Sequence, residues 1–214
     1  MSPAGKVVLA SGNPGKIREI ARLLTPLGLE IVPQEVLGVP PAEEPHPTFV
    51  ENALAKARHA AVATGLPALA DDSGICVAAL GGAPGVHSAR YAGLPSSDEN
   101  NNACLLQQMS ALSDRRAHYY CVIVLVRYAD DPQPIIAEGE WHGEILRSPR
   151  GTRGFGYDPL FLDCHSGLTG AELASSRKNR VSHRGKAMRK LMRVLSTSQG
   201  VVGSGISLPR VRET

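Results

Sequence analysis

The stretch KVVLASGNPGKIREIARLL at residues 6–24 decides the fold class of this sequence. Residues 6–10 form a short apolar run, which predicts a β-strand, and SGNPGK at residues 11–16 predicts a turn. Apolar residues then recur at helical spacing as far as Leu24, and Gly28 marks the predicted end of that helix. The chain therefore opens with a strand, a glycine-rich loop and a helix, which is how an α/β fold begins.

Strands and helices continue to alternate downstream. Strands are predicted at residues 29–32, 67–70, 75–79, 118–128 and 133–146, and helices at residues 48–64, 98–112 and 182–195. Thr48-x-x-Glu51 is a capping box, Asp-Asp-Ser-Gly at 71–74 predicts a polar turn, and Asp-Asp-Pro at 130–132 predicts a hairpin. The two long middle strands suit an antiparallel pair, so the expected fold is α/β around a mixed sheet, in two lobes.

The composition excludes a largely disordered protein, and the charge pattern limits the kinds of partner. The chain has 214 residues, of which 43% are hydrophobic and 20% charged, so disorder over most of its length is excluded. The net charge of +3 hides a split between −6 over residues 1–176 and +9 over residues 177–214. The basic character thus belongs to one segment, which could serve a nucleic acid, a membrane surface or a phosphate-bearing ligand.

The cysteines and the chain ends give expectations about compartment. The four cysteines contain no C-x-x-C pair, which argues against a disulfide framework and a zinc site. The N-terminus has no secretion-signal pattern, and no apolar run is long enough to span a bilayer. We therefore expect a reduced, cytoplasmic protein with no membrane partner. One domain is expected over residues 1–195, and a mobile, Gly/Ser-rich tail over residues 196–214.

The glycine-rich loop at residues 11–16 is a candidate phosphate site. Backbone N–H groups and the dipole at the start of a helix both attract anions, and Lys16 adds a positive charge there. The spacing does not match a P-loop, because only Asn13 and Pro14 separate Gly12 from the Gly-Lys pair. A phosphotransferase with a P-loop variant is therefore disfavoured, and an ordinary βα turn with a surface lysine remains an alternative.

Carboxylates gather in two places. Asp71 and Asp72 are predicted to end a strand, and Glu43 and Glu44 lie in a proline-rich loop at residues 39–47. Mg²⁺ prefers a few such oxygen ligands together with waters and substrate phosphates. Adjacent strand residues point to opposite faces, so the two aspartates need not share a task. The alternative is a structural polar turn.

Two further segments have residues suited to a nucleotide. Gly154-Phe155-Gly156-Tyr157-Asp158 places two aromatics in a glycine loop, where one could stack on a base or anchor the loop to the core. Cations follow at Lys178 and in Ser182-His183-Arg184, where Ser182 could cap a helix. Cations in a first helical turn are disfavoured by the dipole, so they suggest an anionic or acceptor-rich partner.

Six blocks of sequence, in this order, resemble the inosine/xanthosine triphosphate pyrophosphatase family, also called Ham1-like or RdgB-like. They are SGNPGK (11–16), FVENALAKA (49–57), ADDSG (70–74), GAPGVHSAR (82–90), GFGYDP (154–159) and Lys178 with SHRG (182–185). The resemblance spans roughly residues 6–195. It implies an elongated two-lobed α/β fold with a long mixed sheet and a nucleotide cleft between the lobes.

The resemblance also implies an activity and its residues. It implies a homodimer that uses Mg²⁺ to hydrolyse ITP, dITP and XTP to the monophosphate and pyrophosphate, which cleanses the nucleotide pool of non-standard purines. It implies that the substrate is bound by Ser11, Gly12, Asn13, Pro14, Gly15, Lys16, Lys56, Ser73, Phe155, Gly156, Tyr157, Asp158, Lys178, His183 and Arg184. It implies that Asp72 acts at the metal and as proton acceptor, beside Asp71 and Glu44.

Base selection follows from hydrogen bonding. Hypoxanthine and xanthine carry a 6-oxo acceptor where adenine carries an amino donor, so donors from His183, Arg184 and the backbone would favour the former. The alternative function is nucleic-acid binding through the basic segment 177–193. The acidic remainder of the chain argues against it, because it would repel a polyanion, and no stable nucleic-acid partner is expected.

Overall fold

The structure is a computed structural model that describes residues 5–24 and 29–201, with side chains described as far as residue 196. Its centre is a mixed sheet of six strands in the order β2-β1-β3-β4-β5-β6. The strands are β1 (Lys6–Leu9), β2 (Glu30–Pro33), β3 (Ala68–Val77), β4 (Arg116–Val126), β5 (Ile135–Ile145) and β6 (Phe161–Asp163). β1 pairs in parallel with β2 and β3, and the remaining neighbours pair antiparallel.

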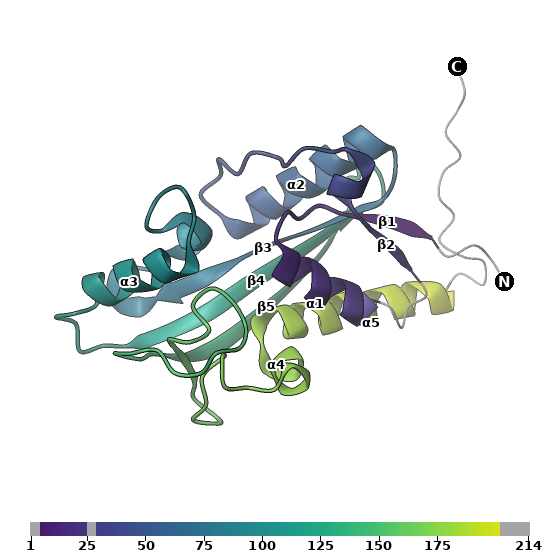
Figure 1. Cartoon of the computed structure of the whole chain (residues 1–214). Helices are drawn as coiled ribbons and strands as arrows, with labels where there is room; N and C mark the ends of the chain where they lie inside the picture. The colour runs from purple at the N-terminus through teal and green to yellow at the C-terminus, as the bar shows by residue number, and fades with distance from the viewer. Residues whose placement is uncertain (1–4, 25–28, 202–214) are drawn as a thin grey trace, which may run out of the picture.

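Helices cover both faces of one end of this sheet. The α-helices of the structure are α1 (Pro14–Leu24), α2 (Phe49–Thr64), α3 (Asp98–Gln108), α4 (Ser175–Val181) and α5 (His183–Val201). Figure 1 shows α2 over one face and α1 and α5 over the other. Along β4, Cys121 and Ile123 pack toward α1 and α5, whereas Val122 and Val124 pack toward α2. Both faces are buried here, which explains the unbroken apolar run in this strand.

The other end of the sheet has its own apolar cluster. Ile75, Trp141 and Phe161 meet there, and Leu105 joins them from α3. Buried and exposed residues alternate along β5, because one face of this strand is uncovered. Figure 1 shows α3 at this end, away from α1 and α5. The predicted α/β fold around a mixed sheet is confirmed, and its two ends carry separate cores.

The predicted turn at residues 71–74 is wrong. β3 runs without interruption from Ala68 to Val77, and Asp71, Asp72 and Ser73 each pair with a residue of β4. Polar residues normally favour a turn over a strand interior. Here the ladder to β4 satisfies the backbone, and basic side chains from the helices pair with the two carboxylates. The aspartates therefore lie in the middle of a central strand and not at its end.

Gly74 in this strand lies against the short 3₁₀ helix Gly85–Arg90. A Cβ atom at this position would collide with the carbonyl oxygen of Gly85 and the hydroxyl of Ser88. We expect Gly74→Ala to lower the free energy of unfolding by about 1–3 kcal/mol, since both neighbours would have to move. Urea denaturation measures this, with Gly5→Ala as control, because a Cβ there meets nothing closer than 3.9 Å. A Gly74→Ala midpoint equal to that of the control would contradict the packing described.

Some element boundaries differ from those predicted. The first helix begins at Pro14, inside the predicted turn, because proline suits a first helical position. The short elements α4 and β6 were not predicted, and α5 continues to Val201, past the predicted end at residue 195. Gly28 and residues 202–214 of the predicted tail lie outside the described residues. In the described ranges, no helix combines the length and apolar character needed to cross a membrane.

Both capping predictions are confirmed. Thr48 is the N-cap of α2, where its side chain accepts from the backbone N–H of Glu51 and donates to the Glu51 carboxylate. The Ser182 hydroxyl accepts from the backbone N–H of Gly185 at 3.2 Å. Each cap satisfies an N–H group that a helix start leaves unpaired. The second cap fixes where α5 begins, and therefore where His183 and Arg184 lie.

Candidate active site

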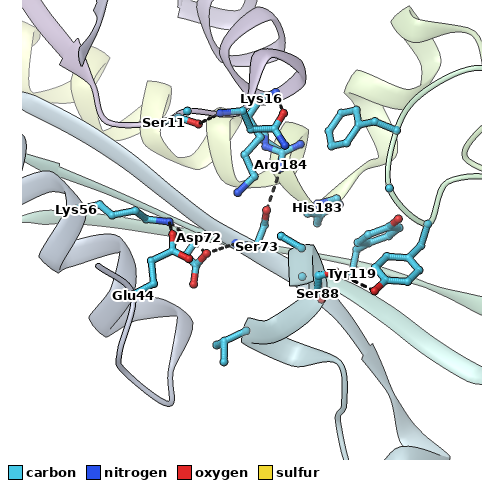
Figure 2. Close-up of a pocket in the computed structure, with 18 of the residues that line it drawn as sticks. Ser11, Lys16, Glu44, Lys56, Asp72, Ser73, Ser88, Tyr119, His183 and Arg184 are labelled. Atoms are coloured by element: carbon cyan, nitrogen blue, oxygen red, sulfur yellow. Dashed lines mark hydrogen bonds and ion pairs between the residues drawn. The ribbon is translucent and has the colours of Figure 1, made fainter. Parts of the chain in front are cut away.

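A cavity of about 250 Å³ lies between the start of α1, the middle of β3, the loop at residues 155–158 and the start of α5. Except for Pro14, Gly15 and Asp71, the predicted site residues line it. They are Ser11, Gly12, Asn13, Lys16, Glu44, Lys56, Asp72, Ser73, Phe155, Gly156, Tyr157, Asp158, Lys178, His183 and Arg184. Figure 2 shows two ends, with Glu44, Lys56 and Asp72 at one and His183 with Tyr119 at the other.

The start of α1 differs from the predicted phosphate site. The Asn13 side-chain oxygen accepts from the backbone N–H groups of Gly15 at 2.8 Å and Lys16 at 3.1 Å. These two amides are therefore already satisfied, and Pro14 has none to offer. The lack of a side chain at Gly15 leaves room for the Phe155 ring, because a Cβ atom there would come within 2.9 Å of that ring. The positive charge that this loop gives the cavity comes from the Lys16 side chain.

Asp72 and Glu44 lie on either side of one ammonium group. The Lys56 Nζ atom is 2.5 Å from Glu44 Oε1 and 3.3 Å from Asp72 Oδ1. Burial raises the pKa of Asp72, although Lys56 and Lys16 oppose the shift. Burial also opposes ionisation of Glu44, but Lys56 outweighs it and lowers the pKa of that carboxyl. Asp72 Oδ2 is buried and has no partner among the described residues, so it can accept from or ligate a bound group.

Asp71 does not line the cavity, and its side chain leaves β3 on the face opposite to that of Asp72. Its Oδ2 atom is 3.1 Å from Lys16 Nζ and 3.3 Å from Arg184 Nε. Burial works against ionisation, but Lys16 and Arg184 lower the pKa of this carboxyl far below its usual range. The adjacent aspartates therefore have different surroundings, as strand geometry predicts. Asp71 holds cations in place, and its Oδ1 atom is buried without a partner among the described residues, so its share in a metal site stays a prediction.

Arg184 is buried and connects several elements. Its guanidinium donates to Asp71, to Glu19 Oε2 at 2.6 Å and to Ser73 Oγ at 2.9 Å. Burial disfavours its charge, but Asp71 and Glu19 reverse this and raise the pKa of Arg184. Lys178 is also buried and pairs with Asp158 at 2.5 Å. Because these two cations point inward, they are not available to an extended nucleic-acid surface.

The two aromatic rings of the predicted loop, Phe155 and Tyr157, have different surroundings. Tyr157 is buried, and its hydroxyl donates to the Ser88 carbonyl at 2.8 Å, so this ring anchors the loop. Phe155 is half-buried and borders the cavity, with Lys178 Nζ 4.9 Å from its ring centroid. Of the two aromatics, Phe155 is therefore the one placed to stack on a planar ligand.

His183 lies stacked on an aromatic ring at this end. Its imidazole is parallel to the Tyr119 ring, with centroids 4.6 Å apart and an interplanar angle of 6°. Burial, together with the charges of Arg184 and Lys178, lowers its pKa well below the usual range, so the imidazole is neutral. Its Nδ1 atom is buried and has no partner among the described residues. A neutral imidazole can offer that atom as donor or acceptor.

Glu19 and Arg90 are among the residues at the site that were not predicted. Glu19 pairs with both Arg184 and Lys178, at 2.6 and 3.7 Å. Its spacing of three from Lys16 places both side chains on one face of α1, which is a signal the sequence contains. Arg90 donates to the Glu44 carboxylate at 3.3 Å and to its carbonyl at 3.4 Å. Nothing in the sequence alone links Arg90 to residues 46 positions earlier.

The Asp72 and Glu44 pair fits a magnesium ion. Mg²⁺ is commonly held by one or two carboxylates plus substrate phosphates, and Asp72 supplies a buried oxygen without a partner. Among the described residues, no group of three or more His, Cys, Asp or Glu side chains is arranged to hold a metal by itself. The donor set thus suits an ion that arrives with a phosphorylated ligand, and it does not suit a closed structural metal site.

The chain is similar to several known proteins. A dITP/XTP pyrophosphatase of Aromatoleum aromaticum is 62% identical over 193 residues, which cover 90% of this chain and 98% of that protein. A protein of the same name from Nitrosomonas europaea is 62% identical over 196 residues, covering 92% and 97%. The structure of a HAM1 protein from Coxiella burnetii matches with a TM-score of 0.85 and 49% identity, covering 90% of this chain and 99% of that one.

A second solved structure, the Staphylococcus aureus Ham1 protein, matches with a TM-score of 0.81 and 37% identity, and it covers 90% of this chain and 99% of that one. The sequence profile of the Ham1 family matches residues 7–194. This range includes both ends of the sheet and all the residues that line the cavity. The chain therefore belongs to the Ham1 family.

Proposed function

We propose that this protein hydrolyses the non-standard purine nucleoside triphosphates ITP, dITP and XTP to the monophosphate and pyrophosphate. Relatives about 60% identical over most of the chain are dITP/XTP pyrophosphatases. The observation that carries the proposal is the two-ended cavity. One end holds lysines and carboxylates suited to a triphosphate and its metal, and the other holds an aromatic ring and a neutral histidine suited to a purine.

The proposed reaction is attack of water on the α-phosphorus. The new bond joins the water oxygen to that phosphorus, the α–β bridging P–O bond breaks, and pyrophosphate leaves. Asp72 accepts the proton from the attacking water, and the raised pKa of Asp72 suits a proton acceptor. Lys16 and Lys56 stabilise negative charge on the departing pyrophosphate. Asp72 and Glu44 would hold Mg²⁺, which supplies further neutralisation of phosphate charge when bound.

Purine selection is assigned to the end of the cavity near α5. The guanidinium of Arg184 already donates to Asp71, Glu19 and Ser73. Replacing Arg184 would therefore disturb the fold as well as the site. His183 gives a cleaner test. We expect His183→Phe to keep the stack on Tyr119 and lower the ITP-over-ATP ratio of kcat/KM by about tenfold, the worth of one hydrogen bond. An unchanged ratio in a folded variant would remove His183 from purine selection.

We also propose a homodimer that works in the cytoplasm. The support for the dimer is the family resemblance, together with exposed apolar side chains such as Val36, Val62 and Ile136 that a partner subunit could cover. The support for the compartment is that Cys76, Cys104, Cys121 and Cys164 are all free thiols. Light scattering after gel filtration should give about twice the chain mass of 22.7 kDa. The mass of a single chain would contradict the dimer.

The function itself is tested with a panel of nucleotides. The purified protein is incubated with ITP, dITP, XTP, ATP or GTP and Mg²⁺, and pyrophosphate and monophosphate are quantified. The proposal predicts rapid release of pyrophosphate from the first three, slow release from ATP and GTP, and loss of release in EDTA that added Mg²⁺ restores. Equal rates for all five nucleotides would contradict the proposed substrate class.

A further inference from the structure

The loop that carries Phe155 contains two flexible positions, although the Asp158 carboxylate accepts from the Phe155 N–H at 2.9 Å and Tyr157 anchors the loop through the Ser88 carbonyl. Gly154 and Gly156 flank the ring, and both have positive φ angles, of 79° and 62°. Glycine loses the most conformational freedom on ordering, so such a loop needs outside contacts to hold one conformation. The placement of Phe155 beside the cavity therefore depends on whatever binds the backbone around it.

Helix α3 supplies two of these contacts, and they meet on one residue. The backbone N–H of Gly156 donates to Asp98 Oδ2 at 2.6 Å, and the Asn102 side-chain amide donates to the Gly156 carbonyl at 2.9 Å. Asp98 and Asn102 are four residues apart, so they lie on one face of the helix. We call this pair the α3 clamp. It holds both polar groups of the residue that follows Phe155.

The helix that carries the α3 clamp is itself held in place by a cap, by core packing and by side-chain hydrogen bonds. The Ser97 side chain caps α3 by accepting from the backbone N–H of Asn100, and the buried Leu105 packs into the core of that end of the sheet. Asn101 is buried and bonds the backbone at Ala89 and Ala92, at 3.0 and 2.8 Å. α3 is thus tied to the segment before it and to the core. Its exposed Asp98 and half-buried Asn102 are left to reach the loop.

We propose that Asp98 and Asn102 are positioning residues for purine binding, which act by fixing the loop that presents Phe155. This rests on the proposed function of the cavity. Asp98 borders the cavity beside Phe155 and Gly156, whereas Lys16 and Lys56 line it from α1 and α2. Loss of the clamp should therefore weaken recognition of the base and leave recognition of the phosphates unchanged.

The first experiment separates these two ends with two inhibitors. Asp98→Ala and Asn102→Ala are each expected to raise the inhibition constant of IMP and the KM for ITP by about three- to tenfold, the worth of one hydrogen bond. The inhibition constant of tripolyphosphate should not change. Asp98→Asn keeps an acceptor oxygen and should restore most of the affinity. Asn100→Ala, an exposed amide on the same helix, is the matched control.

The outcomes are distinct. If both inhibition constants rise together, α3 merely supports the fold, and the proposal is overturned. If neither rises, the clamp has no part in base binding. If the wild-type protein fails to hydrolyse ITP, the proposed function is contradicted and the clamp is not. Hydrogen exchange tests the clamp without any need for activity. Hydrogen exchange of residues 150–158 should be faster in both alanine variants than in Asn100→Ala, and equal exchange rates would show that the clamp does not hold the loop.

Discussion

Replacing Asp72 with asparagine is expected to lower kcat for ITP by about 10²-fold or more while the protein stays folded. The variant keeps the size and one acceptor oxygen of the side chain, but it cannot take a proton from water. Asp72 borders the cavity, and its Oδ2 atom is buried without a partner among the described residues. Burial already disfavours the charge of Asp72, so loss of that charge should cost the fold little.

The matched control for this substitution is Glu43→Gln. Glu43 is exposed and lies next to Glu44 in the same proline-rich loop, yet it does not line the cavity. Its substitution should leave kcat unchanged, whereas Glu44→Gln should weaken the response to Mg²⁺. Steady-state kinetics over a range of Mg²⁺ concentrations measures both effects. Turnover by Asp72→Asn close to that of the wild type would eliminate Asp72 as proton acceptor.

Lys16→Met is expected to lower kcat/KM for ITP by about 10²- to 10³-fold, the range seen when one preorganised donor to a developing charge is lost. Methionine keeps most of the length of the side chain and removes the ammonium group. Because the nearby amides of Gly15 and Lys16 are capped by Asn13, the loop has little else with which to replace that charge. Both the binding of the triphosphate and the departure of pyrophosphate should suffer.

The control for Lys16→Met is Lys190→Met, which removes an exposed lysine from α5. Circular dichroism must show that both variants fold, because Asp71 loses one of its two cationic partners in Lys16→Met. Arg184 remains to pair with Asp71, so a folded protein is expected. If kcat/KM for ITP were the same in the two variants, the triphosphate would have to bind elsewhere.

Much of the site was predictable because its residues lie in short continuous blocks. SGNPGK, GFGYDP and SHRG each bring several lining residues to the cavity, and the caps at Thr48 and Ser182 follow from local rules. The order of the blocks indicated the family. Alternation along strands correctly predicted that Asp71 and Asp72 would have different surroundings.

Other features depend on contacts that no local pattern contains. Asp-Asp-Ser-Gly is a turn composition, and it forms strand because β4 pairs with it along its whole length. The capping of α1 by Asn13 satisfies two of the backbone N–H groups that the glycine-rich turn was predicted to offer to an anion. The roles of Arg90 and of the α3 clamp need residues 46 or more positions apart to meet. Each of these features depends on the three-dimensional surroundings of the residue and not on the local sequence pattern.

The basic segment that follows residue 176 also combines a feature that the sequence predicts with one that depends on tertiary contacts. Its charge alone suggested a surface for a polyanion, but Lys178 and Arg184 are buried against Asp158, Glu19 and Asp71. Arg193 and Lys190 are exposed farther along α5. One segment thus combines a wall of the cavity with a solvated helix face, and only the structure separates the two.

Hydrolysis of ITP in ¹⁸O-labelled water with Mg²⁺ tests the central claim most directly. Mass spectrometry of the products locates the phosphorus atom that water attacks. If the account is correct, one ¹⁸O atom enters the phosphate of IMP, and the pyrophosphate carries none. Label in pyrophosphate, or the formation of IDP with labelled orthophosphate, would contradict attack at the α-phosphorus and the assignment of the lysine-rich end of the cavity to a departing pyrophosphate.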